Sequence, residues 1–280
     1  MSPCAKLSGM SGDLVLTVVR EEDDEHGYVA GFAVTDQMVV AVGGLSSEAP
    51  TVLASSDARR FVERAIPRYR GLRDALAVGD AVWVCGGYGQ LAVTRDHGAT
   101  WSVLETDTEA CLFSLALATD GAVWVVGEDG YVARVLGQRP EILSLGADER
   151  LLAVYPVISA VAAPGEVVIL GARGTLRRWR EGRITEIATG VTTPLTALAI
   201  TSNGTWVIAG DRGLLARSPN GSWFARVKLP HEADLEGLVA LPGGRLVAVG
   251  ALGTVLVSLD DGRTWRSMPH RLGSVHLWSV

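Results

Sequence analysis

The chain has 280 residues, of which 48% are hydrophobic and 33 are glycine, and its formal net charge is −6. This length and apolar content suit one all-β domain with a large core, and the negative charge gives no reason to expect a nucleic-acid partner. The sequence contains no apolar run of 18 residues, so we expect no membrane span.

Residues 1–12 show neither a charged start followed by an apolar stretch nor a cleavage site, so we expect no signal peptide here and a flexible segment. Residues 13–20 are rich in valine and leucine and predict a strand, which we expect to pair with the other end of the chain. The cysteines Cys4, Cys85 and Cys111 lack metal-ligand spacing, which is typical of reduced thiols. A cytoplasmic protein without cofactor or metal is therefore expected.

Glycines that follow a short apolar run recur along the rest of the chain at intervals of 39 to 44 residues. The first glycine of each such turn is Gly43, Gly86, Gly127, Gly171, Gly210 and Gly250. A four-stranded antiparallel blade needs about this length, at roughly 5–6 residues per strand plus short turns. The expected repeat units lie near 28–67, 72–106, 112–145, 152–189, 194–229 and 236–269.

The second unit shows the repeated pattern most clearly. Val82–Cys85 is a short apolar run that predicts a strand buried on both faces. Gly86–Gly89 then predicts a hairpin in which glycine supplies a position with positive φ, and Leu91–Thr94 returns antiparallel.

An aspartate-containing turn follows, and its sequence occurs twice. Thr94–Trp101 reads T-R-D-H-G-A-T-W, and Ser258–Trp265 reads S-L-D-D-G-R-T-W. We expect the carboxylate to accept hydrogen bonds from its own turn, the glycine to be left-handed, and the tryptophan to anchor the next strand. Residues 55–61 and 218–223 are altered copies, and the third and fourth units lack the pattern.

These residues resemble the Asp-box of the bacterial neuraminidase repeat proteins. In that family the box is a structural turn on the outer edge of a β-propeller blade, so the resemblance implies no chemistry. We therefore predict a single all-β domain over residues 1–280, a β-propeller of four-stranded antiparallel blades. Six units indicate six blades, while strands at 13–20 and 275–280 leave a partial seventh open and are expected to close the ring.

The glycine turns and the links between units share one end of such blades, because antiparallel connections alternate between the two ends. At this end lies part of an arginine-rich segment, Arg59–Arg73, with six arginines in fifteen residues. Arginines in such a cluster suit carboxylates or phosphates, and ordinary solvated surface residues are the alternative. The candidate partner-binding residues are Arg64, Arg68, Tyr69, Arg70, Arg73, Tyr88, Arg173 and Arg212.

The second unit also resembles a repeat of the photosystem II assembly and stability factor family of Asp-box propellers. The matching residues are Tyr69-Arg70, Leu72–Val78, Trp83–Gly89 and Thr94–Trp101, and the likeness covers roughly residues 30–266. Members of that family bind partner proteins and are not enzymes. The resemblance implies a protein-binding role in which Arg70, with Arg68 and Arg73, contacts the partner; it is not taken to imply photosynthesis.

Sialidases also carry the Asp-box, but their R-I-P motif near the first box is not found: Gln138-Arg139-Pro140 lies in the wrong unit, and Ile66-Pro67-Arg68 is not the motif. The five histidines are isolated, without the spacing of a metal site. We therefore predict a non-catalytic interaction or assembly scaffold that presents an arginine patch to an acidic segment of a partner protein. A glycan-binding or glycoside-hydrolysing, sialidase-like propeller is the alternative.

Overall fold

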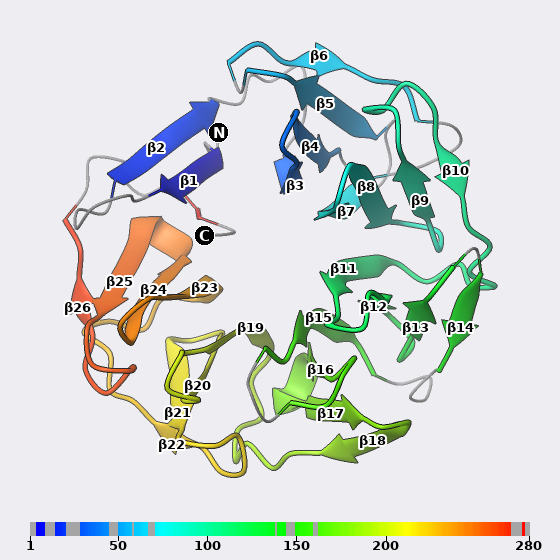
Figure 1. The fold of residues 1–280 in the computed structure, drawn as a ribbon. Coiled ribbons are helices and arrows are strands. Elements are labelled where there is room, and N and C mark those ends of the chain that lie inside the picture. Colours follow the sequence, from blue (N-terminus) through cyan, green and yellow to red (C-terminus); the bar gives the residue numbers. More distant parts are fainter. Residues whose placement is uncertain are drawn as a thin grey trace. The chain divides into compact units, whose positions relative to one another are not determined.

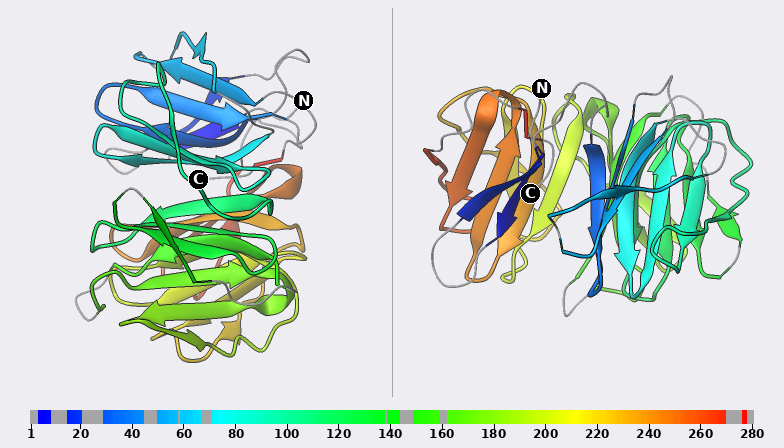
Figure 2. Two further views of the ribbon diagram at one scale, coloured as in Figure 1. Left: turned by 90° about the vertical axis from the view of Figure 1, so that its right-hand side faces the viewer. Right: turned by 90° about the horizontal axis from the view of Figure 1, so that it is seen from above.

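The computed structural model describes residues 4–8, 15–20, 29–44, 50–57, 59–66, 71–137, 139–143, 149–158, 162–269 and 276–277. These residues form strands, turns and two single-turn 3-10 segments, as Figures 1 and 2 show. None of the described helical segments has the length and hydropathy that a membrane crossing requires.

The described strands include six four-stranded antiparallel sheets, and in each sheet the strands lie side by side in chain order (Figure 1). The first sheet contains β3 (Val29–Val34), β4 (Val39–Gly43), β5 (Thr51–Ser55) and β6 (Val62–Glu63), and the second contains β7 (Leu72–Val78), β8 (Ala81–Gly86), β9 (Leu91–Thr94) and β10 (Ser102–Val103). The third contains β11 (Leu112–Leu117), β12 (Val123–Gly127), β13 (Val132–Val135) and β14 (Pro140–Ile142), and the fourth contains β15 (Leu151–Pro156), β16 (Val167–Gly171), β17 (Leu176–Arg180) and β18 (Arg183–Glu186). The fifth contains β19 (Leu195–Ile200), β20 (Trp206–Gly210), β21 (Leu214–Ser218) and β22 (Ala225–Arg226), and the sixth contains β23 (Leu235–Leu241), β24 (Arg245–Gly250), β25 (Thr254–Ser258) and β26 (Arg266–Ser267). The predicted all-β class with four-stranded antiparallel units is confirmed.

Contacts divide the chain into two compact units. One unit, called the N-unit here, consists of residues 23–156 and 164–167 and holds the first three sheets and β15. The other, called the C-unit, consists of residues 1–22, 157–163 and 168–280 and holds the fifth and sixth sheets with most of the fourth. A single domain over the whole chain stays a prediction.

The described N-terminal residues form a pair of strands. β1 (Cys4–Ser8) pairs antiparallel with β2 (Val15–Arg20), while the flexibility expected for residues 1–12 stays a prediction. The strand predicted at 13–20 therefore has a neighbouring strand as its partner. Along the edge that faces β1, its backbone groups do not need the expected pairing with the far end of the chain. The physical reason is that backbone N–H and C=O groups of a strand require partners, and the preceding segment is the nearest in the chain.

Of the strand predicted at the C-terminus, His276 and Leu277 belong to the described residues. The Leu277 side chain is buried against valines of β24 and β25, and its N–H donates to the Gly250 carbonyl at 3.1 Å. His276 Nε2 lies 3.3 Å from Glu236 Oε1. These contacts attach the tail to the sixth sheet, while closure of a ring by both termini stays a prediction.

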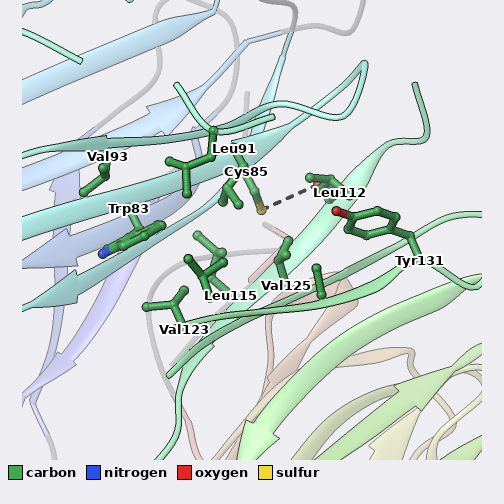
Figure 3. Close-up of a cluster of buried hydrophobic side chains, with 12 residues drawn as sticks. Trp83, Cys85, Leu91, Val93, Leu112, Leu115, Val123, Val125 and Tyr131 are labelled. Carbon is green, nitrogen blue, oxygen red and sulfur yellow. Dashed lines mark hydrogen bonds between the residues drawn. The ribbon is translucent and has the colours of Figure 1, made fainter. Parts of the chain in front are cut away.

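The second strand of each sheet forms the centre of the core. In β12, β16 and β20 every residue is buried, as a continuous apolar run predicts for a strand covered on both faces. Figure 3 shows one such cluster, in which Trp83 and Leu91 pack with Leu115 and Val125. The Cys85 thiol donates to the Leu112 carbonyl at 3.7 Å, and burial raises the pKa of Cys85. Cys85 is therefore a small core residue, as expected.

Side-chain acceptors hold the turns between third and fourth strands. In the second sheet, Asp96 Oδ1 accepts hydrogen bonds from Thr100 N and Thr94 Oγ1, both at 2.8 Å. The hydrogen bond from the Thr100 hydroxyl is the largest cause that lowers the pKa of Asp96, to about 2. Gly98 has φ +81 and its N–H donates to Thr94 Oγ1 at 2.8 Å. The turn thus has the conformation that the sequence predicts.

The first, fifth and sixth sheets have related turns. Asp260 Oδ1 accepts from Thr264 N at 2.9 Å and Ser258 Oγ at 2.8 Å, while Asp57 Oδ1 accepts from the N–H groups of residues 59 and 60. In the fifth sheet Asn220 replaces the aspartate and accepts from Ser222 N at 3.1 Å. We call these four segments the aspartate turns. In each of them the Asp or Asn side chain accepts hydrogen bonds from its own turn, which fits a structural role.

Candidate partner-binding surface at the glycine turns

Two-residue turns join the second and third strands of the second to sixth sheets. In each turn the first central residue is not glycine and has φ between 54° and 61°, and the second is glycine with φ between 61° and 76°. Two successive positive φ angles define a type I′ hairpin turn, which matches the twist of the flanking strands. The non-glycine residues, called turn tips here, are Tyr88, Asp129, Arg173, Arg212 and Leu252, and all five are exposed.

The glycines of these turns have two different roles. The sequence predicts one positive-φ position filled by glycine, whereas the structure has two such positions and fills the first with a tip residue. The first glycine of the motif serves close approach instead: a Cβ at Gly127 would lie 2.3 Å from the Cys111 carbonyl oxygen, and one at Gly250 would lie 2.0 Å from that of Asp234. Larger residues at these positions would therefore displace the link that precedes the sheet.

Backbone hydrogen bonds fasten the turns of the second, third and fifth sheets to the links on either side of each sheet, and Ala251 N of the sixth-sheet turn donates to the Asp234 carbonyl. In the second sheet, Gly87 N donates to the Gly71 carbonyl at 3.2 Å and Gly89 N donates to the Ala110 carbonyl at 2.8 Å. Equivalent pairs are Glu128 to Cys111, Gly130 to Glu149, Asp211 to Pro194 and Gly213 to Ala233. These bonds use main-chain atoms alone. The tip side chains are therefore presented from a fixed backbone without being needed to fix it.

The structure places three of the predicted binding residues at turn tips. Tyr88 is the tip of the second sheet, in the N-unit, and 58% of its surface is exposed. Arg173 and Arg212 are the tips of the fourth and fifth sheets, in the C-unit. The spacing of the glycines predicts that these three residues lie at turn tips, and each is the first central residue of its turn.

The other predicted residues lie elsewhere or outside the described residues. Arg64 N donates to the Val52 carbonyl at 2.8 Å, and the stem of Arg64 packs on an aspartate turn, since a Cβ at Gly98 would lie 3.4 Å from Arg64 Cγ. Arg73 is half-buried in β7. Arg68, Tyr69 and Arg70 fall outside the described residues.

A mixed cluster near the tip of the third sheet contains residues that sequence reasoning missed. Arg150 Nε lies 3.8 Å from Glu128 Oε1, and Arg150 Cζ lies 4.8 Å from the centroid of the Phe113 ring. Burial raises the pKa of Cys111 in the same cluster, and a hydrogen bond from the Arg73 side chain opposes that effect. Position in the blade is what could have identified these residues. Phe113 in β11 and Arg73 in β7 are equivalent, since each is the second residue of its strand and lies where the pairing with the next strand is irregular.

With its sheets of four antiparallel strands the chain is a β-propeller, and the solved structures similar to it have the same class of fold. One is described as YCF48 bound to D1 peptide, with 19% identity over 86% of this chain and 81% of that chain and a TM-score of 0.68. YCF48 from Cyanidioschyzon merolae has 16% identity over 89% of this chain and 87% of that chain, with a TM-score of 0.67. The WD40 β-propeller domain of Doa1 has 15% identity over 99% of this chain and 88% of that chain, with a TM-score of 0.70. No protein-family model and no curated protein matches the sequence.

Proposed function

We propose that this protein is a non-catalytic interaction or assembly scaffold of the Asp-box propeller type, which binds an acidic segment of a partner protein. The candidate binding residues are arginines and tyrosines, of which Tyr88, Arg173 and Arg212 lie at the turn tips, whereas the stem of Arg64 packs on an aspartate turn. They comprise Arg64, Arg68, Tyr69, Arg70, Arg73, Tyr88, Arg173 and Arg212.

The observation that carries the proposal is the set of strained, exposed turn tips. A side chain in the left-handed region costs about 1–2 kcal/mol relative to glycine. Five tips keep such a residue, although the backbone bonds of the turn do not depend on it. Strained positions of this kind are concentrated at functional sites, and tyrosine and arginine are enriched among residues that dominate protein interfaces.

A peptide partner is favoured by one of the similar structures, which is described as YCF48 bound to D1 peptide. An extended peptide would suit turns that are fastened on both sides and do not rearrange. The arginines would pair with its carboxylates through two parallel hydrogen bonds each, which makes recognition directional. The cation–π pair of Arg150 and Phe113 supplies a further cation next to the third-sheet tip.

Charge reversal tests this function. We expect the combined Arg68→Glu, Arg70→Glu and Arg212→Glu variant to lose its co-purifying partner from the native host, because each change replaces an attraction for carboxylates with a repulsion. Quantitative mass spectrometry of the purified complexes measures the loss, which should be at least about tenfold for a change of some 1.4 kcal/mol or more.

The matched control reverses three exposed arginines in the aspartate turns, with Arg59→Glu, Arg60→Glu and Arg263→Glu. It changes the net charge equally and should keep the partner. Equal partner recovery from both variants would contradict the proposal. Turnover of a sialoside or glucan panel by the unmodified protein would instead support the glycosidase alternative.

A further inference from the structure

A pocket of about 510 Å³ opens in the C-unit beside the tip of the sixth sheet. Its lining includes four apolar residues, Leu252, Val255, Met268 and Pro269, together with His231 and Glu232. Ligand-binding pockets typically have volumes of roughly 300–1,000 Å³ and combine an apolar lining with a few polar groups. The pocket therefore has the size and composition of a binding site.

The walls of this pocket are held by main-chain and side-chain bonds. Met268 N donates to the Val255 carbonyl at 2.9 Å, and His231 Nε2 lies 3.3 Å from Thr254 Oγ1. These bonds connect the start of β25 to the link before the sixth sheet and to the segment that follows β26. The pocket is thus preformed, so binding would require little ordering of the protein.

Leu252 is the least expected residue in this wall. It is 75% exposed and has φ 56°. Asparagine or glycine would adopt this conformation with less strain, and an exposed leucine gains little from burial within the chain. Folding therefore does not explain why an apolar side chain occupies this tip, whereas contact with an apolar ligand does.

Carboxylates gather beside the pocket. Glu232 lines it, and Asp234 follows two residues later in the same link, with Asp234 Oδ1 accepting from Arg212 N at 2.7 Å. Burial raises the pKa of Asp211, and the charge of Asp234 adds to that shift while Arg212 opposes it. Burial also raises the pKa of Glu236, and the hydrogen bond with His276 opposes this rise. The charge of Asp234 thus acts on Asp211 and Glu236, and Glu232 lines the pocket two residues away in the same link, so a cation bound here would relieve the repulsion.

We propose that this pocket binds one apolar side chain of a partner peptide that carries a lysine or arginine next to it. The apolar residue would lie against Leu252 and Met268, and the neighbouring cation would pair with Glu232 and Asp234. This partner has the opposite charge to the one proposed for the arginine surface, so the inference does not depend on that function.

Selection from a random dodecapeptide library displayed on phage tests the pocket. We expect the enriched peptides to share a leucine, methionine or phenylalanine next to a lysine or arginine. Synthetic copies should bind at least about tenfold more weakly to two variants, Leu252→Asn, which keeps the left-handed turn, and Ser267→Trp, which fills the pocket. Glu232→Lys should remove the preference for the basic residue.

Tyr88→Asn is the matched control, because it changes an equivalent tip in the N-unit and should leave this binding unchanged. Unfolding curves of all four variants show whether each one is folded, and Leu252→Asn is expected to be at least as stable as the parent. Failure to enrich any peptide, enrichment of peptides without a basic residue, or equal binding to the parent and both pocket variants would overturn the proposal. Each of these results is independent of whether charge reversal at Arg68 and Arg70 releases the other partner.

Discussion

Gly89→Ala is expected to lower the free energy of unfolding by about 3–5 kcal/mol, whereas Gly79→Ala should cost about 1 kcal/mol. Both glycines have positive φ, +65° and +58°, so both substitutions strain the backbone. They differ in their surroundings. A Cβ at Gly89 would lie 1.9 Å from the Thr108 carbonyl oxygen, while one at Gly79 would have no atom within 4 Å.

Urea denaturation of the two variants measures this difference. The slope against denaturant should stay constant, so that the shift of the midpoint reports stability. The Gly89 change should also weaken the bond from Gly89 N to the Ala110 carbonyl, since the link must move away from the new methyl group. Equal losses in the two variants would show that the close fit between glycine turn and link contributes nothing.

The second large effect concerns Asp74, which should make the protein less stable as the pH rises from about 4 to about 6. The residue is half-buried overall, yet both carboxylate oxygens accept from backbone N–H groups at 2.8 Å, Oδ1 from Ala75 and Oδ2 from Leu115. Burial raises the pKa of Asp74 to about 6, and these hydrogen bonds oppose the shift without cancelling it.

The sign follows from proton binding. Between the unfolded pKa of 3.8 and the folded value of about 6, the folded state holds a proton that the unfolded state has released. The free energy of unfolding therefore falls with rising pH over this interval, by up to about 3 kcal/mol. The aspartate turns change stability in the opposite direction and at lower pH. The pKa of Asp96 is lowered from 3.8 to about 2, so its ionised form stabilises the folded state above pH 3.8, and this contribution is lost as the pH falls toward 2.

Denaturation curves across this pH interval isolate Asp74 when the parent is compared with Asp74→Asn, which has no proton to bind. The slope with pH should be largely lost in that variant. Asp80→Asn, at the exposed turn that follows β7, is the control and should keep the parent slope. The same slope in all three proteins would contradict the assignment.

The fold could be predicted from the sequence because a buried second strand and its closing glycine recur at each sheet. Glycine is required at positions such as 127 and 250, because a Cβ there would lie 2.3 Å and 2.0 Å from a neighbouring carbonyl oxygen, so the spacing of these glycines reflects the architecture. The pairing of β1 with β2 was missed because residues 4–8 carry no glycine turn or apolar run of this kind.

The candidate sites were less predictable. Spacing identified Tyr88 and Arg212 as tips, but their left-handed φ could not be foreseen, since neither residue type favours it. The pocket could not be predicted from the sequence, because its walls come from three separate segments near 231–233, 252–255 and 267–269. None of these segments has a composition that indicates a binding site. Only the sheet topology brings these segments together.

The central claim is that the turn tips are used for binding and are dispensable for folding. Its most direct test is the dissociation constant of the co-purified partner for a variant with Tyr88→Asn, Arg173→Asn and Arg212→Asn. Asparagine tolerates the left-handed turn, so the free energy of unfolding should be unchanged or higher, while the dissociation constant should rise at least about tenfold. An unchanged dissociation constant in this folded variant would contradict the claim.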